Sequence, residues 1–149
     1  MDTIYFYSTT DEYGDFSNFS AHGFQIDGKY WKTVEHYFQA MKFEGTEYED
    51  QVQQAYTPKQ AKSLGRRRDF PLRDDWENVK DDIMYQGVLV KFQTHDDLRE
   101  RLLLTGDAQL VESAPSDYYW GSGADGSGLN KLGKILMQVR DELRVNNAE

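Results

Sequence analysis

The strongest hydrophobic pattern in the chain falls on residues 31–43, which read W-K-T-V-E-H-Y-F-Q-A-M-K-F. At about 100° per residue, four apolar side chains of this segment share one stripe, which indicates an α-helix packed against a core. They are Val34, Tyr37, Phe38 and Met41. Thr33 precedes them and can cap the helix by accepting a hydrogen bond from a free backbone N–H group of the first turn. We therefore predict one helix here, with its apolar face in the core.

Three polar residues of the same segment, Glu35, Gln39 and Lys42, are spaced at i, i+4 and i+7. This spacing places their side chains on one stripe beside the apolar face. One interpretation is an ordinary surface ion pair on a half-buried helix, and the spacing alone favours it. The other interpretation is an active site in which a carboxylate, an amide and an amine line the edge of a core.

Elsewhere the patterns predict more helix than strand. Alternating or β-branched runs indicate short strands at 3–8, 23–26, 29–32 and 110–112. Helical periodicity and helix-forming composition indicate helices at 46–55, 57–65, 76–92, 98–104 and 132–143, the first of them exposed. No internal repeat or interdomain linker is visible. We therefore predict a mainly α fold, a compact helical array with a small N-terminal β element, in a single domain over residues 1–149.

Turn and cap residues mark several of these boundaries. Asp27-Gly28 supplies the positive φ angles that a type I′ hairpin turn requires. Thr57-Pro58 places an N-cap residue before a proline at the first helical position, where the missing N–H group costs nothing. Asp96 or Asp97 can cap the helix at 98–104, and Gly106 can close it.

Composition indicates a folded, acidic protein. The chain has 149 residues, 29% charged and 14% aromatic, with a mean hydropathy of -0.80. The hydropathy alone would hint at weak folding, but the aromatic residues can bury large areas in a core. Lys+Arg 17 against Asp+Glu 26 gives a net charge of -9, which opposes nonspecific attraction to phosphates. We therefore expect no general coating of nucleic acid, and any nucleic-acid partner would have to be held by a local basic pocket.

The same composition limits cofactors and location. The absence of Cys excludes disulfides and thiolate metal sites, and the 3 His show no ligand spacing, so we expect neither a metal nor another cofactor. No apolar run approaches ~18 residues, and the N-terminus lacks the pattern of a signal peptide. We therefore expect a cytoplasmic protein that does not bind membranes.

Two polar segments each allow two interpretations. In the loop at 9–20, Phe16 and Phe19 either pin the loop to the core or, together with Asn18, stack a base and bind its edge. Arg66-Arg67-Arg68 forms the one dense positive cluster of the sequence. These arginines either stabilise a helix end in solvent or anchor a phosphate, and the sequence does not decide which of the three would do so.

Residues 117–130 contain four glycines in eight residues, which allow a ligand to approach the backbone closely. The segment also opens a helix whose N-terminus favours anions. It lacks both the Gly-Lys-Ser/Thr ending of a Walker loop and the alternate carboxylates of a calcium loop. It is either a flexible loop or a ligand-binding loop, and the flanking Asp117 and Trp120 favour the second. Trp76 is likewise either a core plug or a stacking wall for a planar base.

Together these segments resemble the YbiA-like family, also called NADAR. The block that carries the resemblance most strongly is Trp31-x-Thr33-x-Glu35-His36-Tyr37-Phe38-Gln39-Ala40-x-Lys42-Phe43. The other blocks follow the family's order over nearly the whole chain: Asp15-Phe16-Ser17-Asn18-Phe19, Leu72-Arg73-x-Asp75-Trp76, Lys91-Phe92, Asp117-x-x-Trp120-Gly121 and Gly128-x-Asn130-x-Leu132-Gly133-x-x-Leu136-Met137.

The resemblance implies an N-glycosidase, a hydrolase that cleaves the bond between a ribose and the nitrogen of a base. It implies two substrate classes: ribosylamino-pyrimidine phosphate intermediates of riboflavin biosynthesis, which would release ribose 5-phosphate, and ADP-ribose attached to guanine in nucleosides or nucleic acid. The compact acidic chain favours the first. A non-catalytic ADP-ribose or nucleotide sensor is a hypothesis of another class, and the intact Glu35 stripe argues against it. The sequence does not indicate the oligomeric state.

Cleavage of an N-glycosidic bond passes through an oxocarbenium-like state, so the site needs a carboxylate near the anomeric carbon and assistance for the departing base. Glu35 is the expected principal carboxylate. The resemblance implies Asp117 as the second carboxylate, either as acceptor for a ribose hydroxyl or as catalytic partner of Glu35. Lys42 acts either as an ammonium, which would hold a phosphate or orient Glu35, or as an amine nucleophile, and we prefer the orienting role. The expected substrate-binding residues are Asn18, Phe19, Gln39, Trp76, Trp120, Asn130 and Arg67.

Overall fold

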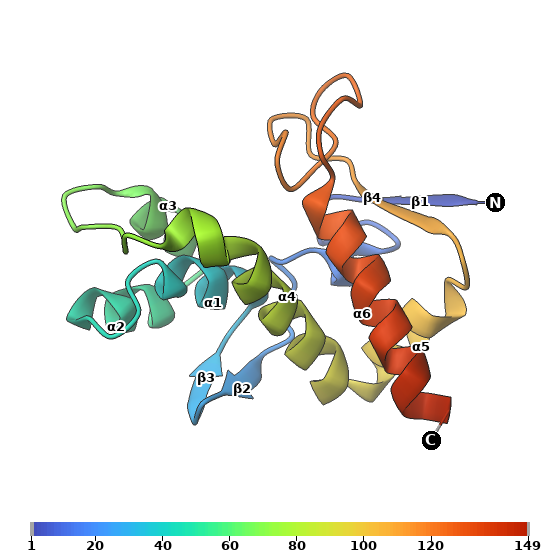
Figure 1. The fold of residues 1–149 in the computed structure, drawn as a ribbon, viewed down its shortest axis with the longest axis horizontal. Helices are drawn as coiled ribbons and strands as arrows, with labels where there is room; N and C mark the ends of the chain where they lie inside the picture. The colour runs from blue at the N-terminus through green and yellow to red at the C-terminus, as the bar shows by residue number, and fades with distance from the viewer. Residues whose placement is uncertain (1, 149) are drawn as a thin grey trace. The chain divides into compact units, whose positions relative to one another are not determined.

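The computed structural model describes residues 2–148, which divide into two compact units (Figure 1). The central unit comprises residues 18–91, and the terminal unit combines residues 2–17 with residues 92–148. Across the described residues, six α-helices accompany two sheets of two strands each. The mainly α prediction is therefore confirmed, whereas the single domain over residues 1–149 stays a prediction. None of the helices within residues 2–148 is both long and apolar enough to span a membrane.

The central unit opens with the predicted hairpin. Strand β2 (Phe24–Ile26) pairs antiparallel with β3 (Lys29–Trp31), and Phe24 lies opposite Trp31. Between them Asp27 and Gly28 have φ angles of 53° and 80°. Both positive angles are those that a type I′ turn requires, so the turn is confirmed.

Helix α1 (Val34–Met41) follows the hairpin directly. The Thr33 hydroxyl oxygen accepts a hydrogen bond from the His36 N–H group at 3.1 Å, which confirms the predicted cap. The helix is shorter than the 31–43 pattern because Trp31 belongs to β3. His36 closes the cap with its ring: Nδ1 lies 2.8 Å from the Thr33 hydroxyl, and Nε2 lies 2.9 Å from the carbonyl oxygen of Ala55. A carbonyl only accepts, so Nε2 carries the proton and Nδ1 accepts from the hydroxyl.

The apolar face of α1 lies in the core, as predicted. Val34, Tyr37, Phe38 and Met41 are all buried. The ring of Tyr37 meets Trp31 edge-on, with their centroids 5.4 Å apart, and the ring of Phe38 lies 5.0 Å from that of Trp76. Aromatic rings from the hairpin and from the start of the last helix of the unit therefore fix the orientation of α1.

Three further helices complete the central unit: α2 (Glu47–Gln53), α3 (Pro58–Arg66) and α4 (Trp76–Thr94), whose last residues belong to the terminal unit. The Thr57 hydroxyl accepts from the Gln60 N–H group at 3.1 Å, which confirms the cap of α3. The prediction that α2 is exposed is wrong in part, because Tyr48, Glu49 and Val52 are buried. Tyr48 stacks on Phe70 with their centroids 4.9 Å apart.

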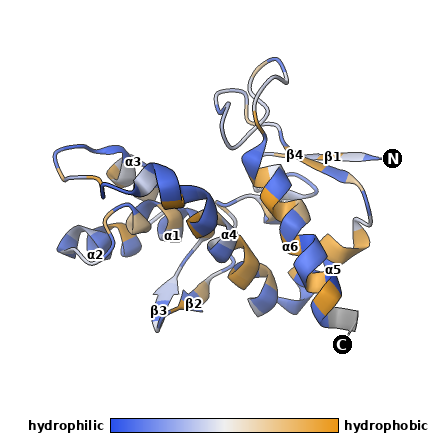
Figure 2. Ribbon diagram, viewed as in Figure 1, coloured by the Kyte–Doolittle hydropathy of each residue, from blue (hydrophilic) through white to orange (hydrophobic). Residues whose placement is uncertain are grey.

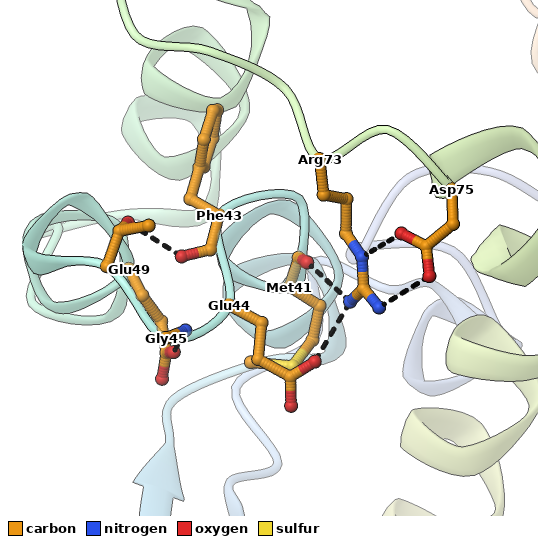
Figure 3. A network of polar contacts seen from close by, with 8 residues as sticks. Met41, Phe43, Glu44, Gly45, Glu49, Arg73 and Asp75 are labelled. Atoms are coloured by element: carbon orange, nitrogen blue, oxygen red, sulfur yellow. Dashed lines mark hydrogen bonds and ion pairs between the residues drawn. The ribbon is translucent and has the colours of Figure 1, made fainter.

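Arg73 joins the end of α1 to the start of α4 (Figure 3). Its guanidinium donates to the carbonyl oxygen of Met41 at 3.2 Å, to Glu44 at 2.9 Å, and through two nitrogens to Asp75 at 2.6 and 3.0 Å. Its backbone N–H group donates to the carbonyl oxygen of Lys42 at 3.1 Å. The block Leu72-Arg73-x-Asp75-Trp76 thus holds Trp76 beside α1.

In the terminal unit, β1 (Thr3–Phe6) and β4 (Gln109–Glu112) form a parallel pair, with Thr3 opposite Gln109 and Phe6 opposite Glu112. Both strands were predicted, but β1 ends earlier than residue 8. The carboxylate of Asp11 accepts from the N–H groups of Tyr7 and Ser8, which turns the chain away from the sheet. A 3₁₀ helix at Gly14–Phe16 follows.

Two helices pack in the terminal unit, α5 (Asp96–Leu104) and α6 (Lys131–Ala148). Hydrophobic and hydrophilic residues alternate around α6 (Figure 2), which agrees with its predicted amphipathic pattern. The cap predicted for α5 is wrong. The helix begins at Asp96, so both aspartates lie in its first turn, and His95 stands at the cap position without a side-chain cap bond. Gly106, with a φ of 63°, follows the helix as predicted.

Candidate active site

Glu35 lies on the first turn of α1 with only 7% of its surface exposed. Its backbone N–H group donates to the carbonyl oxygen of Asn18 at 3.1 Å. Its carboxylate accepts a hydrogen bond from Nε2 of Gln39 at 2.7 Å. The Oε1 atom of Gln39 is buried and has no hydrogen-bond partner among the described residues. Glu35 and Gln39 therefore form a buried, hydrogen-bonded pair in which the carboxylate is held in place.

Burial raises the pKa of the Glu35 carboxyl above its ordinary value. The hydrogen bond from Gln39 opposes this rise, and so do the positive charges of Lys62, Lys42 and Arg66. The protonated form of Glu35 is therefore more favoured in the folded protein than it would be in water. A carboxyl group with a raised pKa can donate a proton to a departing base at neutral pH.

Lys42 follows the last turn of α1 and is 8% exposed. Its ammonium lies 5.8 Å from the ring centroid of Trp76 and 5.9 Å from that of Phe38, and it donates to the carbonyl oxygen of Gly65 at 3.4 Å. Burial, with repulsion from Arg68, lowers the pKa of Lys42 to about 8, although Glu35 opposes this. Within residues 2–148, Lys42 forms no ion pair with the Glu35 carboxylate. Gln39, and not Lys42, is the residue bonded to that carboxylate.

Basic residues of α3 and the segment after it surround this stripe. Lys62 and Arg66 act on the charge of Glu35, and Arg66 and Arg68 act on that of Lys42, as does Lys80 of α4. Arg68 is held by two hydrogen bonds of 2.9 Å, from its Nη1 to the carbonyl oxygens of Gly65 and Arg67. In a chain of net charge -9, this concentration of cations favours an anionic ligand.

Arg67 takes a different direction from its two neighbours. Its guanidinium donates through two nitrogens to Asp69, at 3.1 and 2.6 Å, and both side chains are more than half exposed. Arg67 is the residue at which α3 ends, with extended backbone angles. The positive cluster therefore divides, because Arg66 and Arg68 act on the stripe while Arg67 pairs with Asp69. The role of Arg67 in binding substrate stays a prediction.

Three other predicted site residues of the central unit lie close to the stripe. Asn18 is buried, and its amide donates to Sδ of Met84 at 3.4 Å, a weak acceptor. The ring of Phe19 lies 6.0 Å from the ammonium of Lys62. Trp76 is 5% exposed and contacts Phe38 and Lys42. The central unit thus brings together Asn18, Phe19, Glu35, Gln39, Lys42 and Trp76.

The remaining predicted residues, Asp117, Trp120 and Asn130, belong to the terminal unit. The Asp117 carboxylate accepts from the N–H groups of Tyr119 at 3.1 Å and Trp120 at 2.8 Å. The Asn130 amide accepts from the Glu112 N–H group at 3.0 Å and donates to the Leu110 carbonyl at 2.9 Å. These contacts order the loop. The partnership of Asp117 with Glu35 and the substrate contacts of Trp120 and Asn130 stay predictions.

The glycine-rich segment is ordered by its own backbone. The N–H groups of Gly128 and Asn130 donate to the carbonyl oxygens of Ser122 and Gly121, at 2.7 and 3.0 Å. Those of Lys131 and Leu132, in the first turn of α6, donate to Tyr119 and Trp120, at 3.1 and 3.0 Å. Two N–H donors of this helix N-terminus are therefore already used within the segment, and its preference for an anion stays a prediction.

The sequence patterns did not indicate Lys62 as a site residue, and they did not distinguish Arg68 from Arg66 and Arg67. Lys62 and Arg66 stand at i and i+4, so they share a face of α3, and this spacing was a usable signal. No local signal identifies Arg68, since its position depends on where α3 ends.

Residues 5–144 match the NADAR domain. The chain is 53% identical over 145 residues to N-glycosidase Npun_R5314 of Nostoc punctiforme, a match that covers 95% of this chain and 93% of that protein. It is 48% identical over 146 residues to N-glycosidase YbiA of Escherichia coli (strain K12), covering 97% of this chain and 91% of that protein.

The fold is similar to the NMR structure of E. coli YbiA, with a TM-score of 0.92 and 46% identity over 99% of this chain and 88% of that chain. The chain is also 46% identical over 155 residues to a maize (Zea mays) protein named Riboflavin biosynthesis protein PYRR, chloroplastic. This match covers 94% of this chain and 25% of the maize protein.

Proposed function

The chain belongs to the NADAR domain family and is an N-glycosidase, and from this premise we propose that its substrates are ribosylamino-pyrimidine phosphates of riboflavin biosynthesis. Hydrolysis would release ribose 5-phosphate and the free pyrimidine. The name of the maize relative supports this substrate class. The proposed setting is the cytoplasm, with a small molecule as the partner.

The observation that carries the proposal is the buried Glu35 carboxyl beside a cluster of cations. A base leaves a ribose more easily when its nitrogen takes up a proton, and an acid with a raised pKa can supply it. A neutral ribosylated base would gain nothing from the surrounding Lys62, Arg66 and Arg68. A phosphate on the ribose would, because guanidinium groups bind phosphate through paired donors.

We assign the phosphate to Arg66 and Arg68 in preference to Arg67. Arg68 is fixed by the two carbonyl oxygens it contacts, which leaves its remaining guanidinium N–H groups for a ligand. Arg67 already donates to Asp69 through both Nε and Nη2. Neutralising a phosphate would also reduce the repulsion between Arg68 and Lys42.

Lys42 is assigned as the nucleophile in its amine form. With a pKa of about 8, about one tenth of Lys42 is neutral at pH 7, far more than of a lysine in water. Its nitrogen attacks the anomeric carbon while the bond from that carbon to the base breaks, and the base takes the proton of Glu35. The adduct opens to an imine as a proton moves from the lysine nitrogen to the ring oxygen.

Water completes the cycle. It adds to the imine carbon, and the Glu35 carboxylate accepts one of its protons. The proton of the new hydroxyl group then moves to the lysine nitrogen as the bond from carbon to that nitrogen breaks and the sugar carbonyl forms. One water is consumed, the sugar leaves free, and Glu35 and Lys42 return to their starting forms.

The other residues bind the substrate. Trp76 and Phe19 provide aromatic faces for the base, and Asn18 provides an amide for its edge. By the family resemblance, Asp117 would accept a hydrogen bond from a ribose hydroxyl, and Trp120 and Asn130 would also contact the substrate. Alanine variants of these three test that assignment by their effect on KM and kcat.

Mass spectrometry of products tests the proposal. Wild type, Glu35→Gln and Arg68→Ala are each incubated with a ribosylamino-pyrimidine phosphate and, separately, with ADP-ribosyl-guanosine. The expected result is ribose 5-phosphate from wild type, ribose 5-phosphate with a raised KM from Arg68→Ala, and no detectable product from Glu35→Gln. ADP-ribose as the sole product would contradict the proposed substrate class and indicate ADP-ribosylated guanine as the substrate. Binding measured by calorimetry without any product would support the sensor hypothesis instead.

A further inference from the structure

Helices α1 and α3 pack against each other, and Gly65 lies in their contact. This residue is buried in the last turn of α3 and faces the stripe of α1. A methyl group placed at Gly65 would lie 2.8 Å from both Cβ and Cδ of Gln39, and closer still to its Oε1. Carbon atoms that are not bonded do not come this near, so Gln39 occupies space that any side chain at position 65 would need.

The backbone of Gly65 contacts two other groups of the site. Its carbonyl oxygen accepts from Nζ of Lys42 at 3.4 Å and from Nη1 of Arg68 at 2.9 Å. One residue therefore touches the amide that bonds Glu35, the amine beside it and the arginine assigned to phosphate. None of these contacts involves a side chain of its own.

The amide of Gln39 has little freedom in this arrangement. Its Nε2 reaches Glu35 at 2.7 Å while its Oε1 packs over Gly65. A side chain at position 65 would push the amide away from α3 and change its angle to the Glu35 carboxylate. The hydrogen bond that favours the ionised carboxylate would then be weakened or lost.

We infer that Gly65 is a positioning residue of the active site: its missing side chain lets Gln39 bond Glu35, and its carbonyl oxygen holds Lys42 and Arg68. This role rests on the proposed function only for the identity of the substrate, since the contacts are those of the protein alone. Gly65 has ordinary helical backbone angles, so the conformational freedom of glycine does not explain its role here.

The test compares Gly65→Ala with Ser63→Ala. Both place alanine in α3, where alanine ordinarily stabilises a helix relative to glycine or serine, but Ser63 is exposed and contacts no site residue. Ser63→Ala is expected to keep kcat. Gly65→Ala is expected to lower kcat on the order of 10- to 100-fold, the scale of a misplaced catalytic group. Equal kcat in the two variants would overturn the inference.

A readout that needs no substrate separates this inference from the proposed function. Carboxyl ¹³C NMR follows the titration of Glu35 in wild type, Gly65→Ala and Gln39→Met, which removes the amide but keeps the length of the side chain. Both variants are expected to shift the Glu35 titration to higher pH. An unchanged titration in Gln39→Met would overturn the inference even if Gly65→Ala did not fold, whereas a shift without turnover of either substrate class would count against the proposed function only.

A double substitution tests the steric part. Gln39→Ala removes two of the three atoms that a Cβ at position 65 would meet. Adding Gly65→Ala to Gln39→Ala is therefore expected to lower kcat by a smaller factor than Gly65→Ala does in wild type. Equal factors in both backgrounds would show that the two residues act independently.

Discussion

Replacing Arg73 with alanine should destabilise the protein by disconnecting α1 from α4 (Figure 3). The side chain of Arg73 is 25% exposed, whereas those of Glu44 and Asp75 are 54% and 50% exposed, so both ion pairs are strongly screened by solvent. Exposed pairs contribute about 0–1 kcal/mol each. The half-buried bond to the Met41 carbonyl, made by a charged donor, contributes about 1.5 kcal/mol.

These figures give an expected loss of about 2 kcal/mol in the free energy of unfolding, almost all of it from the carbonyl and Glu44 contacts. For a chain of this length, that loss corresponds to a decrease in Tm of roughly 4–8 °C. Urea unfolding followed by circular dichroism measures the free energy, and differential scanning calorimetry measures Tm.

Arg67→Ala is the matched control, because Arg67 forms the same two-nitrogen fork with an aspartate two residues later but, among the described residues, its side chain makes no hydrogen bond or ion pair to another helix or strand. We expect no resolved loss of stability in this variant. If both variants lost the same free energy, the bond from Arg73 to the end of α1 would contribute nothing to stability.

The other predictions concern the ionisable groups of α1. Because burial raises the pKa of Glu35, the folded state favours its acid form while the unfolded chain is ionised above its ordinary pKa, so stability falls as pH rises through that range. Glu35→Gln should therefore raise Tm at pH 7 while lowering kcat by about 10²- to 10⁴-fold; a lower Tm would contradict the first part and retained turnover the second. Burial lowers the pKa of His36, so its protonation opposes folding. Urea unfolding should show wild-type stability decreasing as pH falls below about 6.5, and His36→Gln should flatten that decrease. With Lys42 acting as an amine, kcat/KM should rise as pH increases through about 8, and borohydride should trap a covalent adduct. A fall in kcat/KM over the same pH range would contradict the amine role of Lys42 and support its role as an ammonium that orients Glu35.

Local patterns predicted the parts of the structure that depend on local chemistry. The apolar stripe of α1 and the caps at Thr33 and Thr57 follow from helix geometry, and the Asp27-Gly28 turn follows from its φ angles. The same spacing brought Glu35, Gln39 and Lys42 together, although it did not show that Gln39 is the residue that bonds Glu35.

Features that depend on distant or irregular backbone were not predictable. The burial of α2 comes from Phe43 and Phe70, which lie outside its own sequence pattern. The separation of Arg68 from Arg67 follows from the extended backbone at the end of α3, where helical periodicity stops applying. In the sequence, Gly65 indicates only the end of a helix. Its positioning role depends on the tertiary contact with Gln39, which no local pattern shows.

The parallel pairing of β1 with β4 affects the order in which the chain can fold during synthesis. The strand made first, Thr3–Phe6, finds its partner only after Gln109–Glu112 has left the ribosome. By then the whole of residues 18–91 has emerged, and the hairpin and helices that hold Glu35, Gln39 and Lys42 depend mainly on neighbours within that segment. Short-range contacts form faster than long-range ones. The arrangement of Glu35, Gln39 and Lys42 is therefore expected to form on the nascent chain before β1 pairs with β4.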